Sequence, residues 1–93
     1  MKYIKKPIAV EAMQYTGDNV KEIVEFTKGN AIYSVLLRTM KIKTLEGDLI
    51  IKNNDYVIKG IKGEFYPCNF DIFKETYDEV VYESNKRGVL FGE

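Results

Sequence analysis

The feature that most constrains the fold is a run of short apolar segments between residues 44 and 68. It reads TLEGDLIIKNNDYVIKGIKGEFYPC, and Glu-Gly-Asp, Asn-Asn-Asp and Gly-Ile-Lys-Gly separate the apolar stretches. Asn, Asp and Gly favour tight turns between strands. The pattern predicts one hairpin that pairs residues 40–45 with 48–52, and a second that pairs 56–59 with 64–67.

Further strands and two short helices are predicted around these hairpins. Residues 8–15 alternate between two faces, as a strand does, and residues 31–37 are rich in strand formers. Residues 20–28 carry apolar side chains at helical spacing after Asp18 or Asn19 as the cap. Residues 70–77 follow Asn69 in the same way, with Phe70, Phe73 and Tyr77 as an inner stripe. The expected fold class is α+β, a small antiparallel β-sheet or partly open barrel of hairpins with two short helices.

Length and composition indicate one small folded domain over residues 1–93. The chain has 93 residues, of which 45% are apolar and 13% aromatic, which is enough for a core. A domain of this size buries only about 60–65% of its unfolded surface, so association between copies would add stability. Residues 79–93 form a C-terminal tail whose order the sequence does not define.

Charge argues against binding of duplex nucleic acid. The net charge is zero, with 14 basic and 14 acidic residues, so the basic excess that binds a DNA or RNA duplex is missing. The balance is uneven along the chain: residues 1–70 hold eleven Lys or Arg and eight Asp or Glu, whereas residues 71–93 hold three and six. A mildly basic body fits a small anionic ligand better than a polymer.

The sequence contains no recognisable catalytic, cofactor or metal motif. There is no histidine, and a single cysteine, Cys68, excludes thiolate clusters and internal disulfides. We therefore expect a protein that is not an enzyme and binds no metal or cofactor, and we expect Cys68 to be a small core residue. No apolar run approaches the length of a membrane span, which favours a cytoplasmic protein without membrane contact.

The turn at Gly60-Ile61-Lys62-Gly63 is the best local candidate for a binding site. Its glycines allow a close backbone approach, and exposed amides in such a turn can hold an anion beside Lys59 and Lys62. An ordinary hairpin turn with solubilising lysines is the alternative. Tyr56 and Tyr66 offer flat rings that can stack on a base, although packing in a core or interface is the more common use.

The chain also resembles a widespread family of small phage and prophage proteins. Residues 5–15, KKPIAVEAMQY, are similar to the family's usual opening KKPVVIEA, an aromatic or aliphatic residue, Gln and an aromatic. Residues 44–48, 55–60, 63–68, 71–73 and 76–77 match further parts of the pattern, so the resemblance covers about residues 3–77. Asn54 departs from it, standing where the family usually has Gly. Asn69-Phe70 also departs, replacing the common Lys-Pro.

The resemblance implies an overlap with phage anti-defence sponges, which bind the cyclic oligonucleotide signals of bacterial immunity, such as those of CBASS, without cleaving them. It implies action in the host cytoplasm. A protomer of this size can hardly enclose a cyclic dinucleotide, so we expect a homo-oligomer, a dimer or tetramer, with the ligand between subunits. The expected ligand-binding residues are Lys59 and Lys62 on phosphates, Tyr56 or Tyr66 on bases, and Lys6 and Gln14 from the first strand.

Two other functions fit the same residues. One is a phage or prophage inhibitor that binds a host protein through an apolar patch such as Val89, Leu90 and Phe91. The other is a virion or assembly accessory protein that takes no small ligand.

Overall fold

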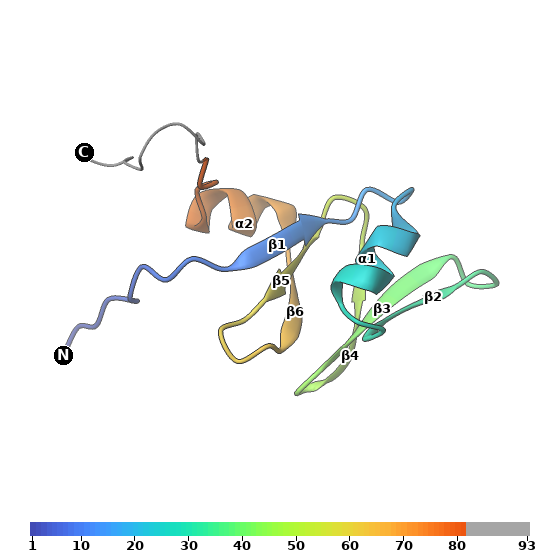
Figure 1. Ribbon diagram of the computed structural model, residues 1–93, viewed down its shortest axis with the longest axis horizontal. Coiled ribbons are helices and arrows are strands. Elements are labelled where there is room, and N and C mark those ends of the chain that lie inside the picture. The colour runs from blue at the N-terminus through green and yellow to red at the C-terminus, as the bar shows by residue number, and fades with distance from the viewer. Residues whose placement is uncertain (82–93) are drawn as a thin grey trace.

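The computed structural model describes residues 1–81 and contains six strands and two helices in that range (Figure 1). In chain order they are β1 Glu11–Gln14, α1 Val20–Phe26, β2 Ala31–Ser34, β3 Thr39–Thr44, β4 Gly47–Ile51, β5 Tyr56–Lys59, β6 Phe65–Cys68 and α2 Phe70–Thr76. Residues 82–93, which hold most of the predicted tail and the Val89-Leu90-Phe91 patch, lie outside the described residues.

The strands form two antiparallel sheets of three strands, which confirms the α+β class. The first sheet has the order β1-β5-β6 and the second the order β2-β3-β4. The alternative of a partly open barrel is wrong, because no strand of the first sheet pairs with a strand of the second within residues 1–81. The β5–β6 hairpin belongs to the first sheet and the β3–β4 hairpin to the second. The two sheets meet mainly through side chains, with β3 near β6.

One core joins the inner faces of both sheets to α1. Met40, Ile42 and Ile51 come from the second sheet, Val57 and Phe65 from the first, and Ile23 from α1. The ring of Phe65 meets Phe26 of α1 edge to face, with 5.6 Å between centroids. The apolar residues that alternate along the predicted hairpins therefore face a shared core, as their period of two requires.

The predicted hairpins are confirmed, with boundaries shifted by about one residue. In the first hairpin Ile42 lies opposite Leu49, and Thr44 lies opposite Gly47 at its turn. In the second hairpin Ile58 lies opposite Tyr66.

The first strand is shorter than its sequence pattern, because its partner ends early. Residues 8–10 alternate correctly but lie outside β1, which begins at Glu11 opposite Lys59. Beyond Lys59 the chain turns at Gly60, so residues 8–10 have no neighbouring strand within residues 1–81. The predicted strand at residues 31–37 also stops early, at Ser34, because the chain turns back before β3.

The two helices begin differently although each follows an asparagine. Asn69 caps α2 as predicted, since its Oδ1 accepts from the backbone N–H of Asp71 and Ile72. Asn19 occupies the cap position of α1 but makes no capping bond. Its Oδ1 instead accepts from Thr16 N, and its Nδ2 donates to the carbonyl of Gln14. Asn19 therefore holds the end of β1 rather than the start of α1.

Candidate functional site

The residues with binding chemistry gather on the face of the first sheet that lies away from the core. Strand register places Ala12, Ile58 and Tyr66 side by side, and next to them Gln14, Tyr56 and Cys68. Helix α2 follows β6 directly and lies along this sheet (Figure 1). Three of the six predicted site residues, Gln14, Tyr56 and Tyr66, thus share a face. The alternation puts Lys59 on the opposite face with Phe65.

Tyr56 belongs to an aromatic ladder that attaches α2 to the sheet. Its ring stacks on Phe73 with 3.8 Å between centroids, and Phe73 stacks on Tyr77 at 4.8 Å. The Lys74 ammonium stands 5.9 Å from the Tyr56 centroid. Because Phe73 covers one face of Tyr56, a base could stack on that face only by displacing the helix. The expected stripe of Phe70, Phe73 and Tyr77 is confirmed, and it packs against Tyr56.

Beside the ladder, residues from α2, the segment after it and the N-terminal segment enclose a groove of about 440 Å³. We call this the aromatic groove, and its lining includes Val10, Ala12, Tyr56, Lys74, Tyr77 and Glu79. Most of its lining side chains are apolar or aromatic, and Lys74 and Glu79 add one charge of each sign.

Tyr66 lies between two other grooves. The lysine groove, of about 290 Å³, runs between the N-terminal segment and the β5–β6 turn and is lined by Lys5, Lys6, Ile8, Val10, Gly60, Ile61, Glu64 and Tyr66. It brings together two predicted site residues, Lys6 and Tyr66, and places them next to the Gly60–Gly63 turn that carries Lys62. Lys5 was not predicted, although it adjoins Lys6 in the sequence.

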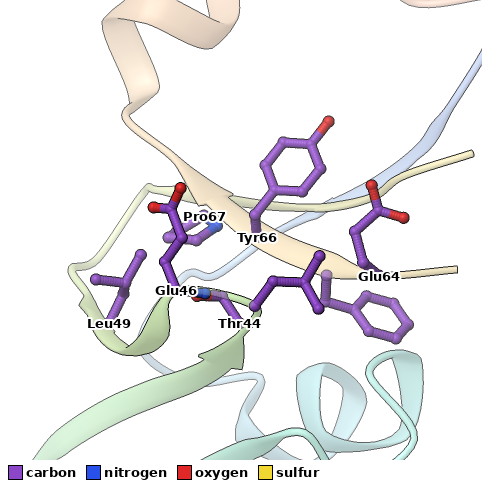
Figure 2. A pocket seen from close by; sticks show the side chains of 8 residues that line it. Thr44, Glu46, Leu49, Glu64, Tyr66 and Pro67 are labelled. Atoms are coloured by element: carbon purple, nitrogen blue, oxygen red, sulfur yellow. The ribbon is translucent and has the colours of Figure 1, made fainter. Parts of the chain in front are cut away.

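The second groove beside Tyr66 is acidic. It measures about 390 Å³ and is lined by Thr44, Leu45, Glu46, Leu49, Glu64, Phe65, Tyr66 and Pro67. Figure 2 shows the Glu46 and Glu64 carboxylates on either side of the Tyr66 ring. In the described part of the chain no lysine or arginine lines this acidic groove, so a phosphate is favoured on the lysine side of Tyr66 rather than here.

The predicted anion site in the Gly60–Gly63 turn already contains a carboxylate. Glu64 Oε1 accepts from the backbone N–H of Lys62 at 3.1 Å, and a Cβ added to Gly60 would meet the same carboxylate. The N–H groups of Gly60 and Gly63 bond within the turn, to the carbonyls of Glu64 and Gly60. An incoming phosphate would therefore compete with Glu64 for this turn.

Gln14 is held at the far end of the same face. Its Nε2 donates to the carbonyl of Asn54 at 3.2 Å, and its own carbonyl accepts from Asn19. Gln14 therefore fixes the connection between β1 and the loop before β5, and it does not line the lysine groove.

Tyr66 and Cys68, which both lie on this face, keep their protons at neutral pH. Burial, followed by the neighbouring Tyr77 hydroxyl, raises the pKa of Tyr66 to about 12, so its phenol remains a donor at neutral pH. Burial and, less strongly, Asp55 raise the pKa of Cys68. The Cys68 thiol is half-buried and stays protonated at neutral pH, which makes it a poor nucleophile.

Residues 1–81 contain no group of three Cys, Asp or Glu side chains placed to hold a metal ion. Neither α1 nor α2 has the length and apolar character needed to cross a bilayer. Comparison of the chain with protein-family models, curated proteins and solved structures finds no match. The candidate site therefore rests on its own geometry.

Proposed function

We propose that the protein is a non-enzymatic phage protein that acts in the host cytoplasm. In this proposal it sequesters a cyclic dinucleotide of bacterial immunity between two of its copies. The observation that carries the proposal is the position of Tyr66. Its ring stands beside a groove with two lysines, and a further lysine lies in the adjoining turn. An aromatic face next to ammonium groups suits a base joined to a phosphate.

The size of the lysine groove supports a site shared between subunits. Small-molecule sites generally occupy about 300–1,000 Å³ and enclose most of the ligand. At about 290 Å³, the lysine groove lies at the lower limit of that range. A second copy facing the first would double the number of lysines and tyrosines, which suits a ligand with two-fold symmetry.

The experiment has two parts. Purified protein is denatured and the supernatant analysed for nucleotides, and refolded or ligand-free protein is then titrated with a panel of cyclic dinucleotides by thermal shift. We expect a shift of several degrees with at least one of them, in line with the stabilisation that a ligand at many times its Kd provides. Absence of both released nucleotide and any shift would rule the proposal out.

Charge-reversal variants test whether the lysine groove is the site. Lys6→Glu should abolish the shift, because it replaces a favourable phosphate contact by a repulsive one. Lys41→Glu is the matched control: Lys41 is exposed on the outer face of the second sheet, and its reversal changes net charge equally. Equal loss in both variants would indicate a general charge effect rather than a site.

A second candidate function, a protein-binding inhibitor of a host enzyme, is favoured by the β2–β3 turn. Val35, Leu36 and Leu37 are consecutive apolar residues there with exposed fractions of 80%, 90% and 69%. Apolar side chains this exposed often mark contact surfaces. Capture of one host protein by the wild type, lost in Leu36→Ser but kept in Lys6→Glu, would support this function against the sponge.

A further inference from the structure

The outer edge of β1 is open in the part of the chain that the structure describes. β1 is the first strand of the order β1-β5-β6, and β5 is its one partner among the strands of residues 1–81. An open edge presents backbone donors and acceptors that another strand can use. The hydrogen-bonding directions and the charges along this edge therefore indicate which strand could pair with it.

The hydrogen bonds at the end of β1 show which residues point outward. Tyr15 N donates to the carbonyl of Asp55, and Asn54 N donates to the carbonyl of Tyr15, so the backbone groups of Tyr15 point toward β5. Because direction alternates along a strand, those of Gln14 and Ala12 point to the open edge. The bond from Asn19 Nδ2 to the Gln14 carbonyl agrees with this direction and closes the edge at that end.

The same alternation continues into the segment before β1. If extended, it would direct the backbone groups of Val10 and Ile8 to the open edge, and those of Ala9 and Pro7 to the other side. Pro7 has no N–H, but its backbone groups point away from the open edge, so pairing at that edge needs no donor from Pro7. Residues 1–9 are exposed, and Ile8 keeps 54% of its surface in solvent. The segment thus has the pattern of a strand but finds no partner strand among residues 1–81.

We propose that residues 5–11 pair antiparallel with the same residues of a second copy, about a two-fold axis at Ile8. This register places Ile8 opposite itself and Lys6 opposite Val10. It also places Lys5 opposite Glu11, and by symmetry Glu11 opposite Lys5, so two pairs of opposite charge form. The two copies of the first sheet then become one sheet of six strands, in which residues 5–11 extend β1 of each copy and lie side by side at the centre.

Charge and alternation together select this register. Cross-strand pairs of opposite charge stabilise a sheet, and like charges directly opposite destabilise it. Placing Lys6 opposite Glu11 would match a residue whose backbone groups point to the open edge with one whose backbone groups point toward β5. An antiparallel ladder does not allow that match. A register centred on Pro7 would leave both Glu11 side chains without a lysine opposite.

Two local contacts must open for the strands to pair. Ile8 N donates to the carbonyl of Lys6 at 2.9 Å in a three-residue turn, and the Lys5 ammonium lies 5.9 Å from the centre of the Tyr77 ring. The ladder replaces the first contact by a pair of bonds between the two Ile8 residues. The Glu11 carboxylate of the other copy replaces the Tyr77 ring as the neighbour of the Lys5 ammonium.

Light scattering on the full chain tests the pairing, with two proline variants as the matched set. The wild type should show twice the chain mass of 10.8 kDa. Ile8→Pro removes an N–H from the open edge and should return the mass to that of one chain. Ala9→Pro adds the same ring one residue away, where the N–H points elsewhere, and should remain dimeric. A wild type of single-chain mass, or equal loss in both variants, would overturn the proposal.

A charge exchange tests the register. Lys5→Glu places one glutamate opposite each Glu11 and should weaken the dimer at least tenfold, whereas Lys5→Glu with Glu11→Lys should restore it. Circular dichroism confirms that each variant is folded. A folded double variant that stays monomeric would exclude this register. If the circular dichroism spectrum shows that the double variant is unfolded, Glu11→Gln takes the place of Glu11→Lys in the same test. The pairing needs no nucleotide, so its failure would be distinct from failure of the proposed ligand.

Discussion

At the scale of single residues, Thr27 is the one buried polar residue within residues 1–81. It is fully buried, with 0% exposure, between α1 and β2. Its Oγ1 donates to the carbonyl of Val24 and accepts from the N–H of Ala31. One hydroxyl therefore satisfies groups on two elements in a place that water does not reach.

Thr27→Val should lower the free energy of unfolding by about 1–3 kcal/mol, because it leaves the buried Ala31 N–H without an acceptor. Denaturant unfolding measures the change. Thr76→Val is the control, since Thr76 is exposed at the end of α2 and its replacement should stay within about 0.5 kcal/mol. Equal effects in the two variants would contradict the assigned role.

Tyr66 predicts a loss of stability in alkali. Its pKa of about 12 in the folded protein exceeds the ordinary value of 10.0, so the folded state retains a proton that the unfolded chain releases. The resulting stabilisation is complete below pH 10 and disappears as the pH rises from 10 to 12. Unfolding followed at several pH values should show this decline, and Tyr66→Phe should make it shallower. An unchanged slope in Tyr66→Phe would contradict the assignment.

At the scale of elements, the two asparagines before the helices have different roles, since Asn69 caps α2 whereas Asn19 holds the end of β1. Asn69 acts only as an acceptor, toward the amides of Asp71 and Ile72. Asn19 acts both as acceptor and as donor, toward Thr16 and the Gln14 carbonyl. Aspartate can replace the first function but not the second, because an ionised carboxylate donates nothing.

Asn69→Asp should therefore leave stability unchanged or raise it slightly, since the negative charge also suits the start of a helix. Asn19→Asp should lower the free energy of unfolding by about 1 kcal/mol through loss of the bond to Gln14. Thermal or denaturant unfolding of both variants at neutral pH makes the comparison. A larger loss in Asn69→Asp than in Asn19→Asp would reverse this interpretation.

At the scale of the whole molecule, a small core coexists with several exposed apolar side chains. Among residues 1–81, nine apolar residues are buried, whereas the β2–β3 turn and the N-terminal segment leave large apolar side chains in solvent. The single chain therefore has little stability to spare, and burial of these segments against other molecules would add to it.

Leu36→Ser in the β2–β3 turn should leave the free energy of unfolding of the monomer within about 0.5 kcal/mol of the wild type, because Leu36 is 90% exposed. Ile42→Ala, in the core, should cost about 2–5 kcal/mol. Both are measured by denaturant unfolding at low protein concentration. A loss in Leu36→Ser that grows with protein concentration would show that the turn is covered in an assembly.

The sequence by itself determined the local elements. Asn, Asp and Gly at the turns, together with a period of two between them, located both hairpins, and Asn69 located the start of α2. These features depend on neighbours a few residues apart, which a sequence displays directly. Lys6 and Tyr66 were predicted as binding residues, and the structure places both along one groove, where their binding role stays a prediction.

Only the tertiary structure decided how these elements combine. The division into two sheets, the shortening of β1 at Glu11 and the separation of Lys59 from Tyr66 all follow from which strand pairs with which. Strand pairing joins residues more than forty positions apart, such as Gln14 and Tyr56, and a single sequence carries no record of it. The stacking of Tyr56 on Phe73 and the carboxylate of Glu64 in the turn depend on that same long-range packing.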